Sequence, residues 1–237
     1  MKAAPLSLLL VASFALCARA DLTIVQNVEG AGPTTSMTIR LKGDKARVDA
    51  GPQISTIIDS KSGEILNIMR EQKKYMRISG AQAKAAAAMA LGGDDEKAGK
   101  PTLQPTGKKE TINGYEAEEY ISQSPAFTAS YWITRDYPNA AEILKQMQAM
   151  TPESWGATAK GMPDYRDFPG LPLRSQMKMA GQEITSTLQS VKLDPLPDAD
   201  FAVPAGFTEM KIPGMDALLG GGKPGAAPKA AASPKSR

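Results

Sequence analysis

The chain has 237 residues, of which 42% are hydrophobic and 22% charged; it contains no histidine and one cysteine, Cys17. Cys17 lies in an N-terminal segment that is expected to be removed, as argued below. The folded part then has no imidazole base, no thiolate nucleophile and none of the nitrogen or sulfur ligands of zinc sites, which excludes most enzyme classes. Residues 21–216 hold 22 basic and 25 acidic residues, a formal charge of −3, and aromatic residues make up 5% of the chain, so no nucleic-acid partner is predicted.

The first twenty residues have the pattern of a signal peptide. A basic start precedes an apolar run, residues 6–16, that is too short to span a bilayer, and residues 18–20 form a small-x-small cleavage site. We predict cleavage between Ala20 and Asp21, which also removes Cys17. The protein is therefore expected to be periplasmic or secreted and not transmembrane; an N-terminal anchor helix and a lipid anchor on Cys17 are the disfavoured alternatives.

Short alternating strands and turns fill residues 21–78. One turn is predicted at Gly43-Asp44, and the segments 54–59 and 64–69 flank residues 60–63, whose Ser-Lys-Ser-Gly composition suits a hairpin loop. Sequential strands joined by short turns usually pair with their neighbours. Six strands in an antiparallel meander are therefore predicted here.

The pattern changes at residues 81–91, which read AQAKAAAAMAL. Alanine is the strongest helix former, so a helix is predicted that ends at Gly92-Gly93. Residues 92–107 contain proline, glycine and mixed charges, which predicts an exposed, mobile loop, with a short strand near Leu103 as a secondary prediction. The acidic run at residues 94–96 lacks the spacing of a calcium-binding loop and is expected to be solvated.

Two further strand signals follow. Asn113-Gly114 is the favoured pair for a two-residue hairpin turn, because both central positions need a positive φ. Residues 127–134 alternate with large side chains on both faces. Such a strand is either central and covered on both sides or lines a cavity with one face.

The chain then predicts a helix and a last hairpin. Apolar residues 143, 144, 147 and 150 have helical spacing, with Asn139 as a cap and Pro152 at the end, and this helix should cover one face of the sheet. Strands beginning at Leu171 are joined at Ala180-Gly181 and are followed by a proline-rich turn and a closing segment, residues 201–203. A change of phase between residues 188 and 191 predicts a β-bulge.

Together these elements predict a mainly β (α+β) fold: a curved antiparallel sheet or incomplete barrel of about ten strands with two covering helices. It would form one domain, residues 21–216. Residues 217–237 are mostly Gly, Pro, Ala, Ser and Lys and are predicted to form a disordered basic tail. Such a tail either docks on anionic envelope surfaces or serves as a plain linker.

Four segments of the chain resemble an uncharacterised family of secreted bacterial proteins, a domain of unknown function. They are NGYEAEEY (113–120), ASYWIT (129–134), LPLRSQ (171–176) and DADFAVPAGF (198–207). The family is similar to the LolA/LolB lipoprotein-carrier superfamily, which implies a strongly curved, incomplete antiparallel barrel lidded by helices. The matching motifs are structural, so the resemblance implies no functional residues, and the Ala-rich insertion 81–100 is not a feature of the carriers.

Catalytic candidates are weak. Glu116 and Glu118, with Glu119 beside them, share a predicted strand, and paired acids cleave glycosidic bonds when one is held protonated. No apolar pocket is evident around them, so a solvated strand face is expected. No Gly-x-Ser-x-Gly or Ser-x-x-Lys frame stands out either, which leaves a histidine-free hydrolase as the least favoured function.

Eleven methionines follow the signal peptide. Thioethers bind Cu(I), but the spacing of these residues favours core packing or a flexible apolar pocket, so no metal or cofactor is predicted. Our hypothesis is a non-enzymatic protein that binds a lipid or lipoprotein acyl chain in the concave face of the sheet; the alternative is an envelope protein-interaction or structural module that uses a sheet edge or the tail. The predicted cavity-lining residues are Met37, Ile39, Leu41, Tyr131, Ile133, Met177 and Met179.

Overall fold

The computed structural model describes residues 21–30, 32–90, 101–123, 128–149, 163–179 and 181–211. The predicted signal peptide, the basic tail and most of the predicted loop 92–107 lie outside these residues. The predicted turn at Ala180-Gly181 lies partly outside them.

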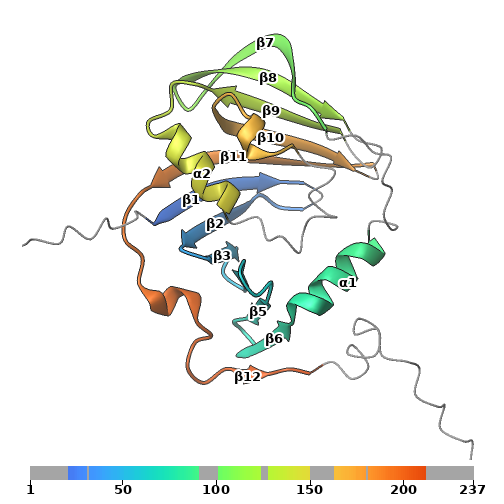
Figure 1. Cartoon of the computed structure of the whole chain (residues 1–237), viewed down its shortest axis with the longest axis vertical. Helices are drawn as coiled ribbons and strands as arrows, with labels where there is room; N and C mark the ends of the chain where they lie inside the picture. The colour runs from blue at the N-terminus through green and yellow to red at the C-terminus, as the bar shows by residue number, and fades with distance from the viewer. Residues whose placement is uncertain are drawn as a thin grey trace, which may run out of the picture.

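Twelve strands of the described chain form one open sheet, in the order β12-β6-β5-β4-β3-β2-β1-β11-β10-β9-β8-β7 (Figure 1). Two α-helices and two short 3-10 helices accompany the sheet within the described residues. The strands are β1 (Leu22–Glu29), β2 (Thr35–Lys42), β3 (Lys45–Ala50), β4 (Ile54–Asp59), β5 (Ile65–Met69), β6 (Lys74–Ile78), β7 (Gln104–Ile112), β8 (Tyr115–Gln123), β9 (Thr128–Thr134), β10 (Leu171–Met179), β11 (Gln182–Lys192) and β12 (Thr208–Glu209). The helices are α1 (Gly80–Ala90), α2 (Ala140–Ala149), η2 (Tyr165–Asp167) and η3 (Asp198–Phe201).

The predicted mainly β fold is confirmed, but the prediction of about ten strands is wrong. The strand β12 has two residues, too few for an alternating pattern to be read from the sequence. It exists because the amide of Thr208 donates to the carbonyl of Lys73 at 2.9 Å and that of Met210 to the carbonyl of Tyr75 at 2.7 Å. This pairing with β6 is parallel, whereas the other strand pairs are antiparallel.

The predicted meander is confirmed, since β1 to β5 each pair with the next strand in the chain. The turn at Asn113-Gly114 is confirmed as well: φ is 51° at Asn113 and 85° at Gly114, the region that such a turn requires at both positions. The amide side chain of Asn113 also donates to the carbonyl of Leu188 in β11. The tip of the β7–β8 hairpin therefore reaches a strand that is three places away in the sheet.

The predicted loop 92–107 is too long at its C-terminal end, because Gln104–Gly107 belong to β7. Pro105 and Gly107 break a typical strand, but β7 is an edge strand and its register shifts between Pro105 and Lys109. Proline and glycine are tolerated at edges and bulges.

A second bulge, in β11, confirms the change of phase predicted between residues 188 and 191. Val25 pairs with Ser190 and Gln26 with Leu188, which leaves Gln189 as the extra residue.

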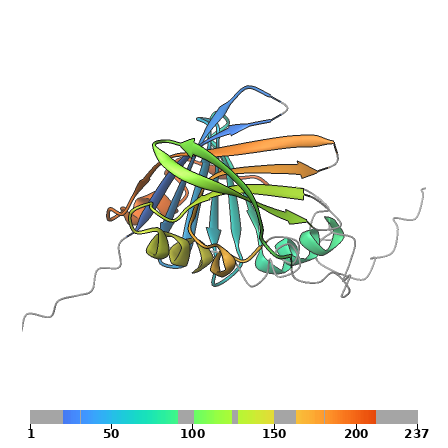
Figure 2. The same cartoon turned by 90° about the horizontal axis from the view of Figure 1, so that it is seen from above.

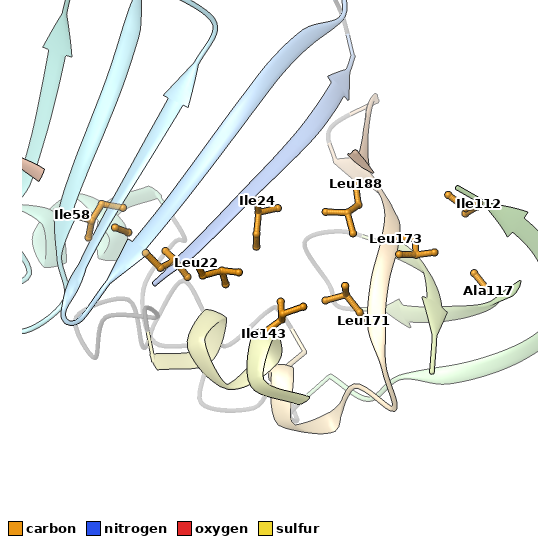
Figure 3. Packing of buried hydrophobic residues seen from close by; sticks show 11 residues of the cluster. Leu22, Ile24, Ile58, Ile112, Ala117, Ile143, Leu171, Leu173 and Leu188 are labelled. Carbon is orange, nitrogen blue, oxygen red and sulfur yellow. The ribbon is translucent and has the colours of Figure 1, made fainter. Parts of the chain in front are cut away.

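Both α-helices lie on the same side of the sheet (Figure 2). The helix α1 begins with a capping box, in which the Ser79 hydroxyl accepts from the amide of Gln82 at 3.3 Å and the Gln82 side chain accepts from the amide of Ser79 at 2.9 Å. The helix α2 carries Ile143, which is 1% exposed and packs in the main core beside Leu171 (Figure 3).

On the other side of the sheet, three arginines of β3 and its neighbourhood surround one carboxylate. Asp49 accepts from Arg47 at 2.9 Å, from Arg70 at 2.7 Å and from Arg40. Arg47 also donates to the carbonyl of Asp200 in η3 at 2.6 Å. This network therefore fastens the C-terminal segment to the sheet.

Candidate functional site

The side of the sheet that carries α2 is apolar, and we call it the apolar face. Residues that lie directly opposite each other on neighbouring strands share a face. Leu22 pairs with Leu41, Leu41 with Ala46 and Ala46 with Ile58, and these four side chains are at most 7% exposed. They pack with Ile143 of α2 in one core cluster.

A second row on the apolar face lies further along β2, β3 and β4, continues onto β5, and is more exposed. Met37 pairs with Ala50, Ala50 with Ile54 and Ile54 with Met69. We call these four residues the methionine row. Ile54 is 50% exposed, and the two methionines are half-buried. An apolar surface therefore crosses four strands without being closed off from solvent.

A third row lies on the other half of the apolar face, across β8 to β11. Ser122 pairs with Ala129, Ala129 with Met177 and Met177 with Ile184. We call these residues the Ser122 row. Exposure rises along it from 1% at Ser122 and 0% at Ala129 to 43% at Ile184. The row therefore leads from solvent into the interior.

Aromatic rings surround the buried end of the Ser122 row. Tyr131 and Phe168 meet edge to face with ring centroids 5.1 Å apart, and Tyr165 lies 5.4 Å from Phe168. These rings cluster with Tyr120, Ala129 and Met177. Burial, with a smaller contribution from Tyr165, raises the pKa of Tyr131 to about 12. The phenol is therefore neutral at physiological pH and adds no charge to this part of the face.

The predicted cavity-lining residues fall into two groups. One group is on β2 and the other on β9 and β10, with β1 and β11 between them. The structure does not bring the groups together. Leu41, Tyr131 and Ile133 are at most 6% exposed and belong to the core clusters, whereas Met37, Ile39 and Met177 are half-buried. The side chain of Met179 lies outside the described residues.

Sequence reasoning missed Ile54, Met69, Ser122 and Ile184 as members of these rows. A signal for the first two was present, because counting outward from the hairpin loop 60–63 places Ile54 opposite Met69. For Ser122 no such signal exists. Its burial depends on packing between β8, β9 and the aromatic cluster, which are separated in the chain.

The acidic cluster on β8 does not form a pair of cooperating carboxylates. The Glu116 side chain is 65% exposed and pairs with Lys109 at 2.8 Å, and Glu118 accepts from the Tyr120 hydroxyl at 3.2 Å. Glu119 points to the opposite face from Glu118. Its side chain is only 8% exposed and accepts from Thr106 at 2.8 Å. The solvated face was expected for Glu116 and Glu118, and Glu116 is exposed; Glu119, on the other face, is buried against Thr106.

Within the described ranges, no group of three or more cysteine, aspartate or glutamate residues is placed to hold a metal ion. No helix in the same part of the chain has both the length and the apolar character needed to cross a membrane.

Comparison with solved structures finds similar chain folds at low sequence identity. The lipoprotein LppX of Mycobacterium tuberculosis is 12% identical over 74% of this chain and 88% of its own, with a TM-score of 0.40. The LolA superfamily protein NE2245 of Nitrosomonas europaea is 12% identical over 77% of this chain and 89% of its own, with a TM-score of 0.34. PNGF-II is 16% identical over 85% of this chain with a TM-score of 0.38, and the chain spans only 33% of its length.

A search among curated proteins found no match to the sequence. The family comparison did find one, and it covers the whole sheet apart from β12. Because residues 21–207 match the family described as "Domain of unknown function (DUF4412)", this chain belongs to that family.

Proposed function

We propose that this protein is a non-enzymatic, exported protein that binds a lipid or the acyl chain of a lipoprotein on the apolar face of its sheet. The observation that carries the proposal is the methionine row, in which Met37, Ala50, Ile54 and Met69 form a continuous, partly exposed apolar strip. Contiguous exposed apolar surface is uncommon on soluble proteins and often marks a binding site.

The composition of the row suits a hydrocarbon ligand. Methionine is unbranched and polarisable, so Met37 and Met69 can adapt to chains of different shape. Covering apolar surface stabilises a complex by about 25 cal/mol per Å² removed from water. Ile54, half of whose surface is exposed, is the residue with most to gain from a covering ligand.

The rest of the proposal follows from the sequence. Export is supported by the signal-peptide pattern before Asp21. A binding role without chemistry is supported by the lack of histidine in the chain and by the acids of β8, which are engaged with Lys109, Tyr120 and Thr106 rather than directed at one point.

The alternative, a protein-interaction module that uses a sheet edge, is not favoured at β7. That edge carries Pro105, Gly107, Lys108 and Lys109 and a shift of register. Proline, lysine and bulges at an edge prevent pairing with another strand. An interaction through the tail is tested by deleting residues 219–237: loss of co-purifying proteins would favour the alternative, and their retention would leave the tail without that role.

Changing Ile54 to glutamate tests the proposed binding surface. The side chain is exposed enough for the variant to fold, but its carboxylate would have to lose water beneath an apolar ligand, which is costly. We expect Ile54→Glu to weaken binding of a neutral fluorescent probe, phenylnaphthylamine, by at least about tenfold, which corresponds to about 1.4 kcal/mol. Fluorescence titration measures the effect.

Gln189→Glu is the matched control, because it adds the same charge at the exposed bulge of β11. It should bind the probe as the unchanged protein does. Lipid extraction and mass spectrometry of protein purified from its native compartment provide the second test. A preparation free of lipid that also fails to bind the probe would contradict the proposal.

A further inference from the structure

The hydroxyl of Ser122 is buried without a hydrogen-bond partner among the described residues. Ser122 is 1% exposed, and it is the buried side-chain group for which no partner is found in that part of the chain. A buried hydroxyl that makes no hydrogen bond costs about 1–3 kcal/mol. Because native proteins seldom leave such groups unpaired, this hydroxyl requires an explanation.

The surroundings of Ser122 are apolar or neutral. Ala129 lies opposite it on β9, and Tyr120 precedes it by two residues on the same face of β8. The nearest charged side chain on this face of β8 is Glu118, whose carboxylate accepts from the Tyr120 hydroxyl. Among the described residues of β8, β9 and β10, this face presents no lysine or arginine beside Ser122.

These surroundings determine which kind of ligand group could accept a hydrogen bond from the Ser122 hydroxyl. A carboxylate buried here would have no cation beside it among the described residues, which is strongly unfavourable. A neutral carbonyl oxygen can accept the hydrogen bond at much lower cost. The Ser122 hydroxyl therefore suits an ester or an amide and not a free acid.

The position of Ser122 in its row suits the remainder of such a ligand. Three strand spacings of about 4.8 Å separate Ser122 from Ile184, a distance of about 14 Å. Ala129 and Met177 lie between them. A hydrocarbon chain laid across this row would cover the exposed surface of Ile184 and would place a carbonyl group near Ser122.

We propose that Ser122 is a polar subsite that donates a hydrogen bond to the carbonyl oxygen of an esterified or amidated acyl chain, whose hydrocarbon lies along Met177 and Ile184, the accessible residues of the row. This subsite deepens the proposed function and rests on it. It names the ligand class as acyl esters or amides in preference to free fatty acids.

Direct binding of two ligands of equal chain length tests the subsite. Methyl laurate and lauric acid are each titrated at neutral pH into the full-length mature protein and followed by calorimetry, because phenylnaphthylamine is the probe of the methionine row, which lies on other strands. We expect methyl laurate to bind at least about tenfold more tightly than laurate. Ser122→Ala should weaken the binding of methyl laurate about fivefold, which is the effect of losing one neutral hydrogen bond. It should leave the affinity for laurate unchanged.

The matched control is Ser130→Ala. Ser130 follows Ala129 on β9 and pairs with Ile121, so its side chain lies on the opposite face from Ser122. This substitution should leave the affinities for methyl laurate and for laurate unchanged. Thermal unfolding provides a second readout: Ser122→Ala should unfold at the same or a higher temperature, because it removes an unpaired hydroxyl from the interior. A lower unfolding temperature would show that Ser122 has a structural partner and would overturn the subsite.

The outcomes separate the two proposals. If the unchanged protein binds the ester and the acid equally well, or if Ser122→Ala has no effect on binding of the ester, the subsite is wrong and the proposed function stands. If the protein binds neither the probe nor the ester nor the acid, the proposed function is wrong and the subsite is wrong with it.

Discussion

Replacing Gly170 with alanine is expected to destabilise the fold by about 3 kcal/mol, at the upper end of the range for overpacked sites. Gly170 is buried between η2 and the start of β10. A Cβ atom at this position would lie 2.1 Å from the carbonyl oxygen of Thr134 and 2.7 Å from its carbonyl carbon. Both are backbone atoms at the end of β9, so no side chain can rotate away, and β9 and β10 would have to separate where Leu171 pairs with Thr134.

Urea denaturation of Gly170→Ala measures the loss of stability. Gly32→Ala is the control, because a Cβ at Gly32 has no atom within 4 Å and its φ is not in the left-handed region. The control should change stability by no more than about 0.5 kcal/mol. A Gly170→Ala protein as stable as the control would show that β9 and β10 do not approach each other in this way.

Replacing Asp49 with asparagine is expected to cost about 3 kcal/mol near neutral pH. Arg47 is only 9% exposed and donates to Asp49 at 2.9 Å. Removing one partner of a buried ion pair leaves the other charge uncompensated, which costs about 3–5 kcal/mol. Arg40 and Arg70 would also lose their shared carboxylate. The C-terminal segment, held to Arg47 through the carbonyl of Asp200, should loosen in the variant.

The effect of this substitution should depend on pH in a defined direction. Burial by itself would raise the pKa of Asp49, but hydrogen bonds from Ser55, Arg47 and Arg40 outweigh it and hold the pKa below its usual value. A carboxyl group whose pKa is lowered by folding stabilises the protein above its unfolded-state pKa of about 3.9. This contribution is lost as the pH falls through the lower folded-state pKa. The difference between the two proteins should therefore shrink below about pH 4.

Urea denaturation at about pH 7 and about pH 3 checks both parts of the expectation. Asp194→Asn is the control, because Asp194 is exposed and makes no ion pair with a described residue. It removes the same charge and should have little effect at either pH. A loss for Asp49→Asn that is equal at both pH values would contradict the assignment of its stability to the ionised carboxylate.

Local patterns in the sequence predicted much of the fold. The Asn113-Gly114 turn, the helix at residues 81–91 and the bulge at Gln189 each depend on neighbouring residues, and each is confirmed. The strand β12 was missed, and the start of β7 was assigned to a loop with a short strand near Leu103. The strand β12 is held by β6, which is distant in the chain, and its two residues are too few for an alternating pattern. The start of β7 contains proline and glycine, which hide the alternation of a strand.

The candidate site was less accessible to sequence reasoning. Alternation identified Met37, Ile39 and Met177 as members of apolar strand faces, but it did not distinguish a side chain in the core from one that stays partly exposed. That difference depends on what covers each row. Tyr131 is buried because Phe168, distant in the chain, packs against its ring, whereas Ile54 remains half exposed.

The sequence by itself determined the hairpins, the helices and the absence of histidine, because these depend on residue identity and on short-range spacing. Only the tertiary structure decided which apolar side chains stay accessible and that the hydroxyl of Ser122 is buried without a partner among the residues that the structure describes. The reason is that burial depends on which distant segments pack over a strand. The order β1-β11-β10-β9, which places residues 22–29 beside residues 182–192, is set by the whole sheet and not by any local pattern.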